Sequence, residues 1–254
     1  MLEVEQIPCL SDNYGFLVHD PNSKQTVCID SPDAEAISTA LEKRNWNLTA
    51  IWNTHHHFDH VGGNKALQER WGCKIIAPKG DGAHITGVDQ WVDDGDTLCI
   101  GAVSAKVLRT PGHTLGHVIY VFDDELMAFV GDTLFALGCG RLFEGTPEDM
   151  WASLQKVKAL PPQTMIYCAH EYTADNLRFA QTIDPYNSDL LSRAKQIGQL
   201  RAAGKWTVPF VLADDLATNP FLRAHDSAIR ERLGLQNAKD VEVFAEIRSR
   251  KDNF

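Results

Sequence analysis

The stretch Thr54-His55-His56-His57-Phe58-Asp59-His60 places four imidazoles and one carboxylate in the six positions from His55 to His60. Neutral imidazole is a good ligand for zinc, iron and similar ions, so a cluster this dense indicates a metal site. The apolar residues 48–53 before it predict a short buried strand. Gly62-Gly63, a candidate N-cap at Asn64 and a helical segment over 65–71 follow. The cluster therefore lies at the carboxyl end of a strand, where α/β folds place their chemistry.

The composition and charge exclude several classes of function. The chain has 254 residues, 44% hydrophobic and 23% charged, which is ordinary for a globular protein with a sizeable core. Its formal net charge of −10 opposes a nucleic-acid-binding surface. No apolar run approaches the ~20 residues that span a bilayer. The N-terminus lacks the basic and apolar regions of a signal peptide. We therefore expect a cytoplasmic protein, a monomer, with no membrane or nucleic-acid partner.

None of the six cysteines forms a Cys-x-x-Cys pair, so neither a thiolate zinc site nor a redox motif is expected. Most lie in apolar contexts and are predicted to be buried thiols. Cys139, between Gly138 and Gly140, is the one cysteine that we single out for a role at the site.

Short strands dominate the first two-thirds of the chain. They are predicted where apolar or β-branched runs are bounded by Gly, Pro or Asp. These runs cover residues 25–30, 50–53, 74–77, 97–100, 104–109, 117–122, 126–130 and 165–168.

Helices form the rest of the pattern. Two are predicted within the strand-rich part, over 33–43 and 147–160, with Asp33 and Thr146 near their starts as caps. After about residue 172, helical spacing appears over 174–182, 190–203 and 226–233, and residues 207–220 look like a connecting segment. We therefore divide the chain into a first domain over 1–172 and a smaller, mostly helical domain over 173–254.

Three later segments each place a His or an Asp just after a predicted strand. They are Thr110-Pro111-Gly112-His113, Val130-Gly131-Asp132-Thr133 and Ala169-His170-Glu171. His55 and His57 share one side of an extended backbone, so both can reach one metal, and a turn after His57 could aim Asp59 and His60 at a second. His56 points the other way, which favours a structural role, and we prefer a packed or supporting role for His117.

The complete set resembles the metallo-β-lactamase superfamily over roughly residues 1–172. The resemblance implies an α/β fold, a four-layer αββα sandwich with one or two metals at one edge. It implies that His55, His57 and His113 bind a first metal, that Asp59, His60 and His170 bind a second, and that Asp132 bridges both. Two divalent ions are expected, zinc first, although an N/O ligand set also accepts iron or manganese. Two metals lower the pKa of a bridging water from ~16 to about 7, so we expect hydrolysis of an ester, thioester or lactam, with Asp59 and Asp132 as catalytic residues.

Further motifs resemble glyoxalase II, the hydroxyacylglutathione hydrolase family, over essentially the full chain. They are Asp12-Asn13-Tyr14, Gly138-Cys139-Gly140-Arg141-Leu142-Phe143-Glu144-Gly145, His170-Glu171-Tyr172-Thr173, Asn219-Pro220-Phe221-Leu222-Arg223 and Arg248-x-x-Lys251-Asp252. The resemblance implies hydrolysis of S-D-lactoylglutathione to D-lactate and glutathione, the second step of methylglyoxal detoxification. It also implies that the glutathione thioester is held by Arg141, Phe143, Tyr172, Arg248 and Lys251. Many relatives have Lys at position 141 and Tyr at position 143, so one substrate hydrogen bond is in doubt here.

Three other functions fit part of the pattern. A persulfide dioxygenase of the same superfamily would hold a single iron and consume oxygen, whereas Asp59, His60 and His170 favour two metals. A lactonase or β-lactamase would share the metal centre but not the basic tail. A metal-dependent binding or nucleic-acid-processing module is opposed by the charge of −10. The tail around Arg248 could instead be a solvated charge run at a fraying terminus.

Overall fold

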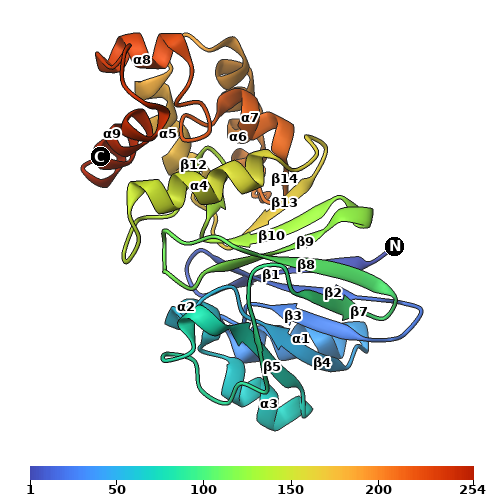
Figure 1. Cartoon of the computed structure of the whole chain (residues 1–254). Helices are drawn as coiled ribbons and strands as arrows, with labels where there is room; N and C mark the ends of the chain where they lie inside the picture. The colour runs from blue at the N-terminus through green and yellow to red at the C-terminus, as the bar shows by residue number, and fades with distance from the viewer.

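The computed structural model describes residues 1–254 and contains two stacked six-stranded sheets (Figure 1). The first has the order β1-β2-β3-β4-β5-β6 and the second the order β14-β13-β10-β9-β8-β7. The strands of the first sheet are β1 (Glu3–Cys9), β2 (Asn13–His19), β3 (Thr26–Ile29), β4 (Leu48–Trp52), β5 (Lys74–Pro78) and β6 (Gln90–Val92). Those of the second are β7 (Thr97–Ile100), β8 (Val103–Arg109), β9 (Val118–Phe122), β10 (Met127–Gly131), β13 (Met165–Cys168) and β14 (Phe210–Val211). A separate hairpin pairs β11 (Leu134–Phe135) with β12 (Gly138–Cys139).

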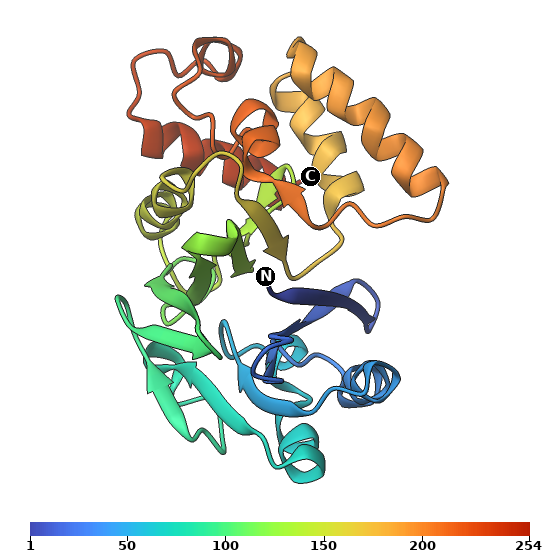
Figure 2. The same ribbon diagram turned by 90° about the vertical axis from the view of Figure 1, so that its right-hand side faces the viewer.

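Helices cover the outer sides of both sheets, so the four-layer αββα sandwich predicted from the sequence is confirmed (Figures 1 and 2). Helices α1 (Ala34–Arg44) and α3 (Asn64–Trp71) pack on the first sheet. Helix α4 (Pro147–Lys158) and the C-terminal helices lie on the side of the second. The remaining helices are α2 (Phe58–Val61), α5 (Thr173–Ile183), α6 (Ser188–Ala202), α7 (Leu212–Thr218), α8 (Ser227–Leu233) and α9 (Asp240–Asp252). None of the helices is long and apolar enough to cross a membrane.

Alternate residues of the inner strands serve two different cores. In β2, Phe16 and Val18 belong to the large core that includes the space between the sheets, whereas Leu17 packs with Ile37 and Leu41 of α1. Both faces of the first sheet are therefore buried, which explains why its inner strands are nearly continuous apolar runs. All eight strands predicted from the sequence are present within two residues of their predicted bounds. Five of the six cysteines are buried free thiols, and Cys99 is exposed.

Local capping sets two helix starts as predicted, but not the third. Asp33 accepts the backbone N–H groups of Glu35 and Ala36 at 2.9 and 3.1 Å, and Thr146 forms a capping box at the start of α4. The prediction for Asn64 is wrong, because it is the first residue of α3 rather than its cap. Its side chain instead bonds Ser31 and Asn53, partners that local sequence does not reveal.

The segment over 207–220 is not the simple connection that the sequence indicated. It contains β14, which pairs antiparallel with β13, and then α7. A two-residue strand is too short to produce a periodic signal, so the pattern could not reveal it. Backbone hydrogen bonds of the second sheet therefore extend into the C-terminal part of the chain.

The basic tail is an ordered helix, so the alternative of a fraying terminus is wrong. Val243, Phe244 and Ile247 of α9 are fully buried, and Phe244 packs against Trp151 of α4 with ring centroids 5.7 Å apart. This packing fixes where the cationic side chains of α9 lie.

A buried ion pair joins α6 and α7 to the loop after β11. Asp215 is fully buried, pairs with Arg193 at 2.5 Å and accepts from the Leu137 backbone N–H at 3.3 Å. Asp215→Ala leaves Arg193 as an uncompensated buried charge, so we expect a loss of about 3–5 kcal/mol of unfolding free energy. Chemical denaturation measures this loss, and the double variant with Arg193→Met should recover part of it. A loss below ~1 kcal/mol would contradict the assignment, since this is the scale of one ordinary hydrogen bond.

Candidate metal centre

The seven side chains predicted as ligands meet at one edge of the stacked sheets, each near the end of a strand. His55 and His57 follow β4, and the single turn of α2 carries Asp59 and His60. The others come from the β8–β9 connection and from the residues after β10 and β13. They are His113, Asp132 and His170. Three overlapping groups of three have donor atoms within 4.8 Å of one another: His55 with His57 and His113, His55 with His60 and Asp132, and Asp59 with His60 and His170.

Three imidazoles converge in the first group. His57 Nδ1 lies 3.1 Å from His55 Nε2 and 2.9 Å from His113 Nε2. The Nδ1–H of His113 donates to the carbonyl oxygen of Arg141 at 2.9 Å, because a carbonyl can only accept. Neutral His113 therefore presents an Nε2 lone pair to His57, as a metal ligand must.

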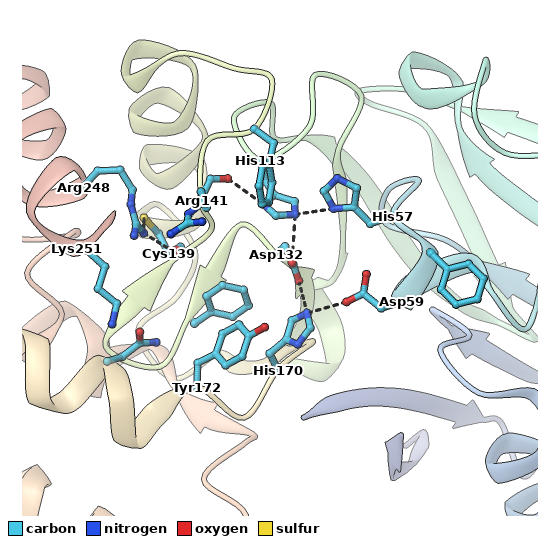
Figure 3. A pocket seen from close by; sticks show the side chains of 14 residues that line it. His57, Asp59, His113, Asp132, Cys139, Arg141, His170, Tyr172, Arg248 and Lys251 are labelled. Atoms are coloured by element: carbon cyan, nitrogen blue, oxygen red, sulfur yellow. Dashed lines mark hydrogen bonds and ion pairs between the residues drawn. The ribbon is translucent and has the colours of Figure 1, made fainter. Parts of the chain in front are cut away.

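The second group combines imidazoles with carboxylates. His60 Nδ1 faces Asp30 at 2.8 Å and His170 Nδ1 faces Asp12 at 2.8 Å, so each ring donates outward and turns its Nε2 inward. His170 Nε2 lies 3.4 Å from both Asp59 Oδ2 and Asp132 Oδ1. Figure 3 shows Asp132 between His113 on one side and His170 on the other.

Two orphaned atoms show that a cation fits this arrangement. His60 Nε2 and Asp132 Oδ1 are both buried without a hydrogen-bond partner, and they lie 3.4 Å apart. Leaving such groups unpaired is costly, and a divalent ion among them would satisfy both. The donor set of imidazole nitrogens and carboxylate oxygens suits zinc, iron or manganese.

The protonation states of His55, His57 and Asp132 suit metal binding, whereas His60 must lose a proton, because the carboxylates of Asp132 and Asp30 raise its pKa to about 9 against the effect of burial. Burial and the neighbouring imidazoles lower the pKa of His55 well below its usual value and that of His57 to about 4. Burial would raise the pKa of Asp132, but the surrounding imidazoles, His170 first, hold it well below its usual range. These rings are therefore neutral and the carboxylate ionised at neutral pH, as ligands must be.

His56 and His117 lie outside the converging groups, in agreement with the roles favoured from the sequence. His56 faces Asp81 through both its backbone N–H and its Nδ1, each at 3.0 Å. His117 is fully buried, and its Nε2 accepts the backbone N–H of Asp132 at 3.1 Å. Gly131 has φ +48°, and a Cβ there would lie 2.6 Å from Thr54 Oγ1, so only glycine permits this close approach before Asp132.

A cavity of about 630 Å³ opens from the metal centre toward the C-terminal helices (Figure 3). Its size suits a small organic ligand. All five predicted substrate-binding residues line it together with metal-centre residues. The lining is His57, Phe58, Asp59, His113, Asp132, Phe135, Cys139, Arg141, Phe143, His170, Tyr172, Asn176, Arg248 and Lys251.

The wall opposite the metal centre is cationic. Arg248 is only 6% exposed, donates to the Cys139 carbonyl at 2.9 Å and to Asp252 at 2.8 Å, and keeps a buried Nε without a partner. Arg141 reaches the same Asp252 oxygen at 3.3 Å. Burial raises the pKa of the Cys139 thiol to about 11, so this cysteine is part of the wall rather than a thiolate. Such a surface suits an anionic ligand.

Sequence reasoning missed several residues around the site. Asp30 and Asp12 orient His60 and His170, and Asn13 donates to Asp59 Oδ2 at 2.9 Å. Asp12 and Asn13 fell in a motif that was noticed without a role. Asp30 was only the end of a strand, and its φ of +55° is a conformation that Asp tolerates better than most residues.

Comparisons with known proteins agree with this architecture. Residues 26–170 match the model of the metallo-β-lactamase superfamily, and residues 171–254 match that of the hydroxyacylglutathione hydrolase C-terminus. Hydroxyacylglutathione hydrolase from Maricaulis maris is 56% identical and that from Brucella anthropi 58% identical, each over the whole chain and at least 97% of the relative. The chain belongs to the hydroxyacylglutathione hydrolase family.

This member of the hydroxyacylglutathione hydrolase family also shares its fold with solved structures of lower sequence identity. ETHE1 from Myxococcus xanthus superposes with a TM-score of 0.69 at 24% identity, covering 97% of this chain and 90% of that one. The B3 metallo-β-lactamase BLEG-1 gives a TM-score of 0.65 at 24% identity, covering 87% and 99%. These similarities concern the fold, and the family comes from the closer relatives.

Proposed function

We propose that this chain is a thioester hydrolase that converts S-D-lactoylglutathione and water to D-lactate and glutathione, the second step of methylglyoxal detoxification. The observation that carries the proposal is one cavity with a His/Asp metal centre at one wall and Arg141, Arg248 and Lys251 at the other. Relatives at 56–58% identity carry the name hydroxyacylglutathione hydrolase, which favours this function over the dioxygenase and lactonase alternatives.

In this proposal the seven side chains hold two divalent ions. His55, His57 and His113 would hold the first ion, and Asp59, His60 and His170 would hold the second. Asp132 suits a bridge, because its Oδ2 lies 3.2 Å from His113 Nε2 and its Oδ1 lies 3.4 Å from His60 Nε2. We favour zinc, with iron or manganese as substitutes. TTHA1623, 26% identical over 65% of this chain and 91% of its own with a TM-score of 0.57, was solved in a di-iron-bound form.

When bound, the two ions would supply an activated water and a Lewis acid for the thioester carbonyl. Asp59 lines the cavity and its Oδ2 is fixed by Asn13, so this carboxylate can orient the attacking water. The glutathione sulfur needs no protein acid to leave, because a thiol with a pKa of ~8.5 is a good leaving group.

The second domain, proposed over 173–254, would supply Arg248 and Lys251, two of the five residues that hold glutathione. Arg248 and Lys251 of α9 face the cavity from the side opposite His57 (Figure 3). Tyr172 stacks on His170 with ring centroids 4.6 Å apart, and its hydroxyl points toward the metal centre (Figure 3). Guanidinium groups bind carboxylates in a bidentate fork, so the glycine end of glutathione would lie against this wall.

The enzyme would work as a cytoplasmic monomer. Glutathione is the main thiol pool of the cytosol, which is where a glutathione thioester would arise.

Phe143 tests the substrate side of the proposal. Its ring makes T-shaped contacts with the rings of His57 and His113, with centroids 5.5 and 5.2 Å away, and is largely exposed at the cavity. Phe143→Tyr adds one hydroxyl, and a neutral hydrogen bond contributes ~1 kcal/mol. We expect the KM for S-D-lactoylglutathione to fall about five-fold with kcat unchanged. Phe58→Tyr, another exposed ring of the cavity, is the control, and an equal fall in both variants would contradict a specific contact.

A direct assay distinguishes the proposed function from its rivals. Purified protein with measured metal content is given S-D-lactoylglutathione while loss of the thioester and dissolved oxygen are followed together. Fast hydrolysis without oxygen uptake is the expected result. Oxygen consumption with glutathione persulfide, or turnover of a lactone but not the thioester, would move the chain to one of the alternatives.

A further inference from the structure

Asp81 is a buried carboxylate near the metal centre that contributes no ligand to it. It ends the short 3₁₀ turn Lys79–Asp81 after β5 and is only 2% exposed. One of its oxygens, Oδ2, accepts three hydrogen bonds of 3.0 Å each. The donors are the backbone N–H of His56, the Nδ1–H of His56 and the hydroxyl of Thr114.

These donors are the immediate neighbours of the first ligand group. His56 lies between His55 and His57, and Thr114 follows His113. A single oxygen therefore ties together the two segments that carry all three nitrogens of that group. The contact is close, since a Cβ on Gly116 would lie 2.1 Å from the other oxygen of Asp81, and only glycine leaves the carboxylate room.

A second contact connects His56 to the loop after β12. His56 Nε2 lies 3.6 Å from Glu144 Oε1, and the other oxygen of Glu144 accepts the backbone N–H of Leu115 at 2.7 Å. The same loop supplies the Arg141 carbonyl that orients the ring of His113. His56 thus lies between two carboxylates and outside the groups of converging ligands.

The second ligand group has separate supports. Asp30, after β3, holds His60, and Asp12, between β1 and β2, holds His170. None of the hydrogen bonds of Asp81 goes to either of these segments. Asp81 therefore supports the first group without bonding the second, whereas Asp30 also accepts the backbone N–H and the hydroxyl of Thr54, beside His55, at 2.8 Å each.

We propose that Asp81 is a positioning residue that sets the metal affinity of the group formed by His55, His57 and His113, independently of the group formed by Asp59, His60 and His170. The inference rests on the metal-binding role proposed above for these side chains. Partners that orient ligands typically change metal affinity 10–100-fold when removed. Asp81→Asn should therefore lower the affinity for one of the two ions by about this factor and leave the affinity for the other unchanged.

The test measures metal binding rather than turnover. Wild type, Asp81→Asn and the milder Thr114→Val are titrated with Co²⁺, and bound metal is counted after dialysis against a weak chelator. Histidine N–H resonances shifted by the paramagnetic ion identify the group that keeps it. Asp12→Asn is the corresponding variant for the second ligand group. Asp215→Asn, at the buried ion pair of α7, controls for lost stability.

We expect two ions in wild type and one tightly held ion in Asp81→Asn, with shifted resonances from His60 and His170. Thr114→Val should lower the affinity for the same ion by a smaller factor. Asp12→Asn should leave metal binding by His55, His57 and His113 unchanged. Unchanged affinity in Asp81→Asn would overturn the inference, as would equal weakening of both ions with a melting shift like that of Asp215→Asn. A wild type that binds no metal would overturn the proposed function as well.

Discussion

Asp132→Ala is expected to lose bound metal and nearly all thioester hydrolysis together. Asp132 is the one carboxylate that faces both ligand groups, with Oδ2 3.2 Å from His113 Nε2 and Oδ1 3.4 Å from His170 Nε2. Removing it takes the shared negative charge from a buried set of imidazoles. Because removing an outer partner alone costs 10–100-fold in metal affinity or activity, we expect a fall in kcat of more than about 10³-fold here.

Metal analysis and steady-state kinetics on the same sample check this result. Asp94→Ala, which removes an exposed carboxylate paired with Lys156 of α4, is the control and should keep both metal and turnover. Full metal occupancy with normal turnover in Asp132→Ala would rule out the bridging role.

Arg248→Ala is expected to raise the KM for S-D-lactoylglutathione strongly while kcat changes only a few-fold. The guanidinium is buried at the cavity wall, and its Nε has no partner within the protein. A hydrogen bond to a charged group contributes about 1.5–3 kcal/mol, which corresponds to about a 10- to 150-fold rise in KM. The kcat should hold because the reacting carbonyl lies at the other wall, at residues that this substitution does not touch.

The neighbouring Arg250 supplies a matched control for that variant. It lies on the same helix, carries the same charge and pairs with Glu246 on the exposed surface at 2.7 Å. Arg250→Ala should leave KM within two-fold, and Arg248→Lys should fall between wild type and Arg248→Ala, since an ammonium keeps the charge without the fork. Equal KM values for Arg248→Ala and Arg250→Ala would mean that long-range charge, not contact, binds the substrate.

The metal centre could be predicted because its ligand residues lie in short sequence motifs at the ends of strands. Each of His55, His113, Asp132 and His170 follows a segment that forms a strand, and strand ends gather at one edge of a sandwich. The structure brings all seven predicted side chains and all five predicted substrate contacts into one cavity region. Which metal each residue binds stays a prediction.

The supporting shell could not be predicted, since its residues act across long sequence separations. Asp12 hydrogen-bonds His170, and Asp81 hydrogen-bonds Thr114. Nothing in the local sequence around either partner predicts these contacts. Strand β14 was not predicted for a different reason: it has two residues and is defined only by its pairing with β13. Helix α9 was missed because its charged residues dominate the pattern, although Val243, Phe244 and Ile247 bury a narrow apolar stripe.

Stepwise return of metal to the chelated enzyme tests the central claim most directly. The metal-free protein is titrated with Zn²⁺ while hydrolysis of S-D-lactoylglutathione is followed in a closed cell with an oxygen electrode. The account predicts that hydrolysis is absent at first, rises with added metal, saturates at two equivalents per chain and consumes no oxygen. Hydrolysis that is already maximal without metal, or a titration with iron that saturates at one equivalent with oxygen uptake, would contradict it.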